Sequence, residues 1–115
     1  MALVIYHNPR CSKSRQTLAL LEERGAMPAI RLYLEDPPSK TEIKALAQAL
    51  GISSVRDMMR TKEAVYKDLA LKDETNEAAL IDAIAENPIL IERPIVTNGK
   101  RAAIGRPPET VLGIL

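Results

Sequence analysis

The first third of the chain alternates between short apolar runs and one amphipathic segment. Residues 3–6 form a continuous apolar run that ends in an Asn-Pro turn, which predicts a buried strand. Over residues 12–24 apolar positions recur at helical spacing, and Gly25 follows as a typical helix-ending residue. Residues 29–34, AIRLYL, alternate in part and predict a second strand. Because parallel strands need a crossover of this kind, we expect a β-α-β unit.

The middle of the chain has a helical pattern. Ser39 and Glu42 have the spacing of a capping box, and apolar residues follow at i, i+3, i+4 and i+7 until Gly51. Further helices are predicted over residues 55–60, 63–69 and about 76–86.

The C-terminal part returns to a β pattern. Residues 94–105 contain two β-type runs around Asn98-Gly99, a strong hairpin signal. The last ten residues, RPPETVLGIL, predict a helix with prolines in its first turn. The order β-α-β, helices, β-β-α predicts an α/β fold in which helices cover a mixed sheet, built as one domain over residues 1–115.

Composition limits the classes of function. The 16 basic and 15 acidic residues nearly balance, which argues against a nucleic-acid partner. No apolar run approaches the roughly 18 residues of a membrane span, and no signal peptide is predicted, so no membrane partner is expected. The single cysteine cannot form an internal disulfide, which suits a cytoplasmic protein. No metal and no tightly bound cofactor is expected.

Cys11 lies where the first predicted strand has ended and the first helix begins. Unpaired backbone N–H groups at a helix start stabilise an anion, either a thiolate or a bound oxyanion. Arg10, Lys13 and Arg15 place basic residues nearby. A helix terminus contributes only ~0.3–1 kcal/mol, so a strongly lowered thiol pKa needs further cations or direct hydrogen bonds. We therefore expect an ionised Cys11 that is open to solvent.

The same residues also have plainer explanations. A free cysteine is usually a small buried hydrophobe, although the polar neighbours of Cys11 argue against that. His7, the only histidine, is either a hydrogen-bonded structural residue or a group that tunes the thiol. Each of Arg10, Lys13 and Arg15 is better explained as part of a solvated face than as a direct ligand.

Spacing excludes two cysteine motifs. A Cys-x-x-Cys pair needs cysteine where Ser14 stands, and the Cys-x5-Arg phosphate loop needs arginine where Thr17 stands. The remaining Cys-x-x-Ser suits a monothiol redox site whose disulfide partner is another molecule. Arg93 and Arg106 each precede a proline, which restricts the backbone, and a guanidinium suits a tetrahedral oxyanion; both could equally be surface arginines.

Five segments together resemble the glutaredoxin-dependent arsenate reductases: YHNPRCSKSR, LYLEDPP, SVRDMMR, NPILIERPIV and IGRPPETVL. They follow the family's order and span nearly the whole chain. The resemblance implies a thioredoxin-like fold with a helical insertion over about residues 36–88, and a cis peptide bond before Pro94. The site residues that it implies are Cys11, His7 and Ser14 for catalysis, with Cys11 as nucleophile, and Arg60, Arg93 and Arg106 for oxyanion binding.

The reaction implied by this resemblance is the reduction of arsenate to arsenite. The thiolate attacks arsenate and displaces water, glutathione attacks the thiol–arsenate adduct, and glutaredoxin then removes the glutathione. Glutathione is thus a co-substrate, and the implied partners are arsenate or a similar oxyanion, glutathione and glutaredoxin.

Two features depart from the family's well-known members, and two other functions stay open. Ser12-Lys13 stand where those members have Gly-Thr, and the chain stops at Leu115 where they continue. One alternative is a non-enzymatic, thioredoxin-like transcription regulator that binds RNA polymerase, although such sensors usually carry a second cysteine where Ser14 stands. The other is a general monothiol oxidoreductase that acts on glutathione mixed disulfides.

Overall fold

A four-stranded mixed sheet forms the centre of the protein in a computed structural model that describes residues 3–115. The strands are β1 Val4–Tyr6, β2 Ala29–Arg31, β3 Ile95–Thr97 and β4 Ala102–Ile104, in the spatial order β2-β1-β3-β4. β1 pairs with β2 in parallel, whereas the β1–β3 and β3–β4 pairs are antiparallel. The predicted mixed sheet is therefore confirmed. Residues 1 and 2, which belong to the signal-peptide argument, lie outside the described residues.

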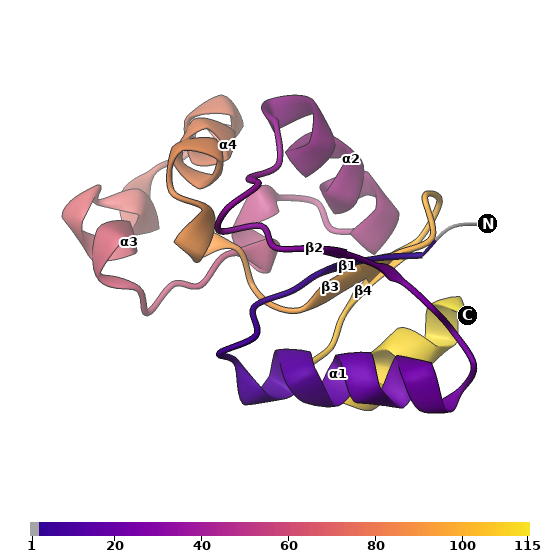
Figure 1. The fold of residues 1–115 in the computed structure, drawn as a ribbon. Coiled ribbons are helices and arrows are strands. Elements are labelled where there is room, and N and C mark those ends of the chain that lie inside the picture. Colours follow the sequence, from indigo (N-terminus) through magenta and orange to yellow (C-terminus); the bar gives the residue numbers. More distant parts are fainter. Residues whose placement is uncertain (1–2) are drawn as a thin grey trace.

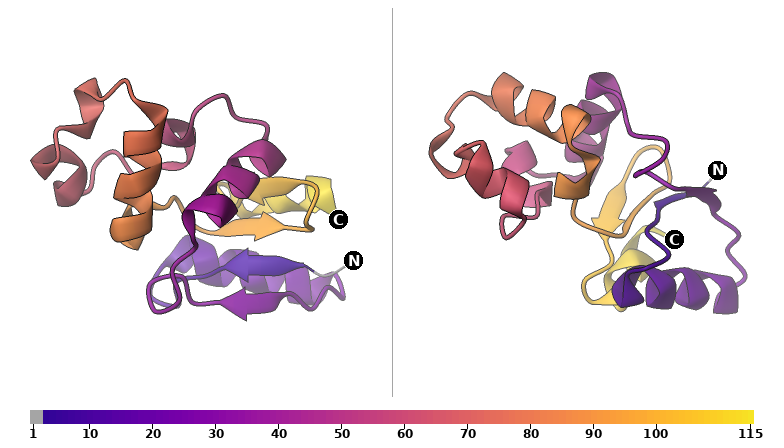
Figure 2. Two further views of the ribbon diagram at one scale, coloured as in Figure 1. Left: turned by 90° about the horizontal axis from the view of Figure 1, so that it is seen from above. Right: turned by 60° about the vertical axis from the view of Figure 1, so that its left-hand side comes forward.

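Helices cover both faces of this sheet (Figures 1 and 2). Helix α1 (Ser12–Glu23) and the C-terminal 3₁₀ helix η4 (Pro108–Ile114) pack together on one face. On the other side lie α2 (Lys40–Leu50), α3 (Ala64–Asp68) and α4 (Glu77–Glu86), with α3 farthest from the sheet. Three short 3₁₀ helices, η1 Val55–Met58, η2 Leu71–Asp73 and η3 Pro88–Leu90, connect them.

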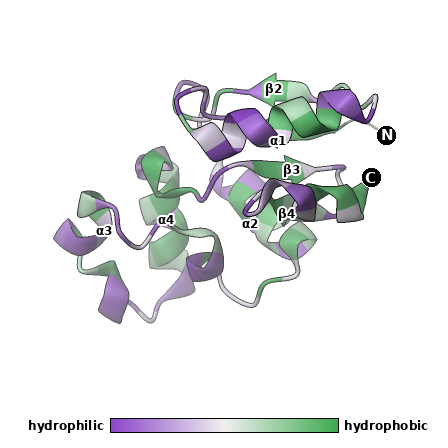
Figure 3. Ribbon diagram, turned by 90° about the horizontal axis from the view of Figure 1, so that it is seen from below, coloured by the Kyte–Doolittle hydropathy of each residue, from purple (hydrophilic) through white to green (hydrophobic). Residues whose placement is uncertain are grey.

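Neighbouring residues of each strand enter two different apolar clusters. Ile5 and Val96 pack with Leu21 of α1 and with η4, whereas Tyr6 and Ile95 pack with the helices of the opposite side. This follows from the alternation of side chains in a strand. In Figure 3 the strands and α4 are largely hydrophobic, while α1 also carries a hydrophilic side.

The capping box predicted for α2 is present. The Ser39 hydroxyl accepts from the Glu42 N–H at 3.2 Å, and the Glu42 carboxylate accepts from the Ser39 N–H at 3.0 Å. Gly51 ends the helix in the left-handed conformation, with φ of 73°. The Asn98-Gly99 hairpin between β3 and β4 is also confirmed, with the Asn98 N–H donating to the Arg101 carbonyl at 3.0 Å.

Several predicted boundaries are wrong, either because a local turn ends the segment or because a distant strand partner takes part of it. β2 ends at Arg31 rather than at residue 34, since the Leu32 carbonyl accepts two N–H groups of a turn, from Glu35 and Asp36. The helix predicted over 55–60 stops at Met58. After it, residue 59 pairs with Ile91 as an isolated bridge.

Other helical segments differ in kind or extent. The segment predicted over 63–69 is the shorter α3, and the turns η2 and η3 were not predicted. The C-terminal helix is 3₁₀ rather than α, in a segment where Pro107 and Pro108 lack the N–H groups that an α-helix uses. Both Arg93-Pro94, as predicted, and Arg106-Pro107 are cis. Within residues 3–115, none of the helices has the length and apolar character needed to cross a membrane.

Candidate active site

Cys11 is the N-cap residue of α1, as the sequence predicts. Its N–H donates to the Asn8 carbonyl at 3.0 Å, which closes the loop between β1 and α1. The residue is only 9% exposed, so the expectation of a cysteine open to solvent is wrong. The neighbours Arg10 and Ser12 are exposed, and Cys11 belongs to neither apolar cluster. The sulfur therefore lies outside both apolar clusters, and the Arg106 guanidinium reaches it.

Polar groups around Cys11 stabilise its thiolate. Burial alone raises the pKa of the Cys11 thiol, but the Ser14 backbone N–H and the charge of Arg93 act against it. The Lys13 backbone N–H and the charge of Arg106 add to them, and the net result is a pKa below its ordinary value. This direction agrees with the sequence prediction. The groups that lower the thiol pKa are backbone N–H groups at the helix start and two arginines that are distant in sequence but act on the thiol in the fold.

Arg106 reaches the sulfur directly. Its Nη2 lies 3.6 Å from Cys11 Sγ, while its Nε donates to the Arg93 carbonyl at 2.8 Å and pairs with Glu92 Oε1 at 3.0 Å. The guanidinium is thus held at one end and directed to the thiol at the other.

Arg93 contributes charge from the start of β3. Its Nε is buried and has no hydrogen-bond partner within residues 3–115. A buried unpaired donor is unfavourable, and it is the kind of group that an oxyanion can satisfy. Together with its effect on Cys11, this makes Arg93 a candidate ligand for an anion.

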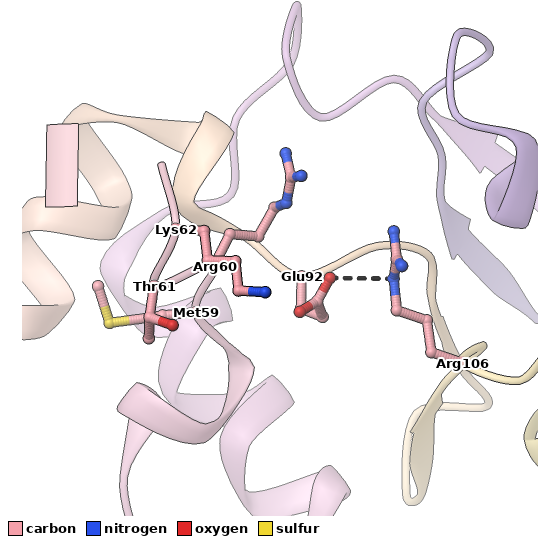
Figure 4. Close-up of a pocket in the computed structure, with 6 residues that line it drawn as sticks. All are labelled: Met59, Arg60, Thr61, Lys62, Glu92 and Arg106. Atoms are coloured by element: carbon pink, nitrogen blue, oxygen red, sulfur yellow. Dashed lines mark ion pairs between the residues drawn. The ribbon is translucent and has the colours of Figure 1, made fainter. Parts of the chain in front are cut away.

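Arg60 lines a cavity of about 280 Å³ next to Arg106 (Figure 4). Its N–H donates to the Leu90 carbonyl at 2.7 Å, and its guanidinium pairs with Glu63. The lining residues are Met59, Arg60, Thr61, Lys62, Glu92 and Arg106. Cys11 and Arg93 are not among them, so Arg106 is the residue that joins the cavity to the thiol.

Tyr33 is a site residue that the sequence reasoning missed. It is 1% exposed, and burial raises the pKa of its hydroxyl. The positive charges of Arg93 and Arg60 act to lower that pKa, and the charge of Cys11 acts to raise it. Tyr33 therefore lies close to all three charged groups. Its position in the LYLEDPP segment is the only sequence signal that could have found it.

His7 and Ser14 form a buried pair beneath the loop. His7 Nδ1 lies 2.6 Å from Ser14 Oγ, which also accepts from the Asn8 N–H at 3.1 Å. Burial first, and then the charge of Arg15, hold the pKa of His7 below its ordinary value, so the imidazole is neutral at pH 7. Ser14 thus meets His7 with its side chain and supports Cys11 with its backbone N–H.

The three basic residues around Cys11 form a solvated face. Arg10, Lys13 and Arg15 are exposed, and the Arg15 guanidinium donates to the Pro9 carbonyl at 2.8 Å. Their side-chain charges are not among the largest effects on the thiol pKa. In the part of the chain from residue 3 to 115, no group of three or more His, Cys, Asp or Glu side chains is arranged to hold a metal ion.

A mixed sheet with helices on both faces (Figure 1) and one cysteine at the start of α1 is the architecture of a thioredoxin-like protein with a single-cysteine site. The chain belongs to the ArsC family, whose model matches residues 6–114. An arsenate reductase of Haemophilus influenzae is 57% identical over all of both chains. One of Escherichia coli is 44% identical over 98% of this chain and 80% of its own. The solved arsenate reductase of Vibrio cholerae is 58% identical with a TM-score of 0.96, over 100% of this chain and 98% of that one.

Proposed function

We propose that this protein reduces arsenate to arsenite, with Cys11 as the nucleophile and with glutathione and glutaredoxin as the source of electrons. The observation that carries the proposal is the contact of 3.6 Å between Arg106 Nη2 and Cys11 Sγ beside a cavity with three cationic side chains. The names of the similar proteins support arsenate as the oxyanion.

In the first step the Cys11 thiolate forms a sulfur–arsenic bond. One arsenate oxygen takes up two protons and leaves as water, and arsenic keeps its +5 oxidation state. Because a thiolate and an oxyanion repel each other, the reaction needs cations that neutralise the substrate. Arg106 and Arg93 act next to the sulfur, and Arg60 acts from the wall of the cavity.

In the second step glutathione supplies the missing reducing equivalent. Its thiolate attacks Cys11 Sγ, a disulfide forms, and the electron pair of the sulfur–arsenic bond passes to arsenic, which becomes arsenite. A glutaredoxin thiolate then attacks the glutathione sulfur and releases the Cys11 thiolate. The chain has no second cysteine, so the partner thiol comes from outside. A reducing, cytoplasmic location is proposed with this chemistry.

His7 and Ser14 support the nucleophile in this proposal. Ser14 donates its backbone N–H toward the thiolate, and its hydroxyl is fixed between the Asn8 N–H and His7. The pair therefore keeps the first turn of α1 in the geometry that stabilises the sulfur anion.

The test is arsenate-dependent NADPH consumption in a coupled assay with glutathione, glutathione reductase and glutaredoxin. Cys11→Ser is expected to abolish turnover while the fold survives. Ser12→Ala, a substitution at the neighbouring exposed residue, is the matched control and should keep turnover. Full activity of Cys11→Ser would show that Cys11 is not the nucleophile and would refute the mechanism. Disulfide exchange without arsenate turnover, unaffected by Arg93→Ala, would instead favour the general monothiol oxidoreductase. Inactivity in both assays together with capture of RNA polymerase would favour the regulator.

A further inference from the structure

We infer that Glu92 is a positioning residue that holds the Arg106 guanidinium against Cys11. This inference deepens the proposed function and concerns the same site. Glu92 Oε1 lies 3.0 Å from Arg106 Nε and also accepts from the Arg93 N–H at 3.3 Å.

The contacts of Arg106 divide its guanidinium into a fixed end and a working end. At the fixed end, Nε faces the Glu92 carboxylate and donates to the Arg93 carbonyl at 2.8 Å. At the working end, Nη2 faces Cys11 Sγ at 3.6 Å. A planar guanidinium held at Nε has a restricted orientation, so the fixed end determines where the Nη groups lie.

The charge of Glu92 makes a role in direct anion binding implausible. Glu92 is the only acidic residue among the six that line the cavity, where Arg60, Lys62 and Arg106 are the basic ones. In Figure 4 its carboxylate lies between Arg106, to which it is joined, and the ammonium end of Lys62. A carboxylate beside an oxyanion repels it, so its useful effect must come through the cation that it orients.

The backbone of Glu92 is held independently of its side chain. The Glu92 N–H donates to the Met58 carbonyl at 2.8 Å, and Ile91 pairs with Met59. A substitution at position 92 can therefore remove the carboxylate while the segment keeps its place. Around the thiol itself, the charged or titratable groups that act on Cys11 or respond to it are Arg93, Arg106 and Tyr33.

The test is the pH midpoint of iodoacetamide alkylation of Cys11, measured on the full chain. This measurement uses no arsenate, so its outcome is independent of the substrate in the proposed function. Loss of a nearby negative charge by itself moves the midpoint down, because a thiolate is then less repelled. If Glu92 positions Arg106, Glu92→Ala moves the midpoint up, because Arg106 no longer faces the sulfur. Glu92→Gln keeps a polar side-chain oxygen beside Nε and removes the negative charge, so its midpoint stays at or below that of the wild type.

In the Arg106→Ala background, Glu92→Ala is expected to shift the alkylation midpoint in the opposite direction. Without Arg106, Glu92 can act on the thiol only through its own negative charge, so adding Glu92→Ala moves the midpoint down. The KM for arsenate rises roughly 3–10-fold in Glu92→Ala, because the charge-assisted contact of Arg106 with the anion is weakened. If Arg106 kept its orientation, the loss of negative charge from the cavity would instead lower this KM. Asp82→Ala, which breaks the surface ion pair between Asp82 of α4 and Lys40 of α2, is the matched control and leaves both values unchanged.

Two results would overturn the inference. One is a lower midpoint in both Glu92→Ala and Glu92→Gln, which means that the carboxylate acts only as a charge. The other is an unchanged midpoint in both variants, which means that Arg106 keeps its orientation without Glu92. Urea unfolding curves of each variant establish that the compared proteins are folded, and Glu92→Ser replaces Glu92→Ala if the latter does not fold.

Discussion

The Arg106 guanidinium lies 3.6 Å (Nη2 to Sγ) from Cys11, although 95 positions separate the two residues in the chain. The sheet topology explains the contact. β1 and β4 are each antiparallel to β3, so they point the same way and end at the same edge of the sheet. Cys11 follows β1, Arg106 follows β4, and Arg93 precedes β3 at that same edge. The strand order thus brings one thiol and two cations together.

Arg106→Ala is expected to raise the pKa of Cys11 and to lower kcat/KM for arsenate. The variant removes both the positive charge and the donor nearest to the sulfur, and loss of one oxyanion donor typically costs about 10²-fold or more. The alkylation midpoint and the coupled assay measure the two effects. Arg101→Ala, at an exposed arginine of the β3–β4 hairpin, is the control and should match the wild type. An unchanged midpoint in Arg106→Ala would show that Arg106 does not stabilise the thiolate.

The sequence predicts the local elements of this fold better than its site. The capping box of Ser39 and Glu42, the Asn98-Gly99 hairpin and the position of Cys11 at a helix start are local patterns, and the structure confirms them. Segment ends that depend on distant partners were predicted wrongly. Residue 59, for example, pairs with Ile91 rather than continuing a helix.

The charged residues at the site also divide into those that a local pattern reveals and those that only the fold brings together. Arg10, Lys13 and Arg15 are near Cys11 in sequence, but their side chains are exposed and are not among the groups that most affect its pKa. Arg93 and Arg106 do affect it, and only the strand order brings them there. Periodicity and spacing cannot reveal such convergence, which is why the resemblance to a family was needed to select these arginines. The burial of Cys11 was missed for the same reason.

Ser14→Ala is expected to lower the free energy of unfolding while leaving the pKa of the Cys11 thiol nearly unchanged. Ser14 is fully buried, and its loss leaves the Asn8 N–H and His7 Nδ1 without their partner. Unsatisfied buried groups cost about 1–3 kcal/mol, which urea unfolding can measure. The backbone N–H that stabilises the thiolate remains, so the alkylation midpoint should stay close to that of the wild type. A large midpoint shift at unchanged stability would assign the effect to the hydroxyl, and Ser12→Ala is the exposed control.

Gly105→Ala is expected to destabilise the protein by about 1–3 kcal/mol, the usual effect of overpacking. A Cβ at position 105 would lie 2.5 Å from Thr17 Oγ1 and 2.9 Å from Pro94 Cγ, so α1 or the segment before β3 must shift. Gly113→Ala is the matched control, since a Cβ there meets nothing within 4 Å. Thermal unfolding of the two variants gives the comparison. Equal melting temperatures would mean that the close approach of Gly105 to Thr17 and Pro94 is easily relieved.

His7 should make the protein less stable as the pH falls below about 6.5, the ordinary pKa of histidine. Burial, and secondarily the charge of Arg15, lower the pKa of His7 in the folded state. Between the folded and unfolded pKa values the unfolded chain therefore binds more protons, and the free energy of unfolding increases with pH. The stabilisation is complete above the unfolded pKa and is lost as the pH falls through the folded one. Linkage to one proton limits the slope to about 1.4 kcal/mol per pH unit. Urea unfolding at pH 7.5 and 5.5 measures it, and His7→Asn should show a smaller difference between the two pH values. A variant whose difference equals that of the wild type would place the acid sensitivity in the carboxylates rather than in His7.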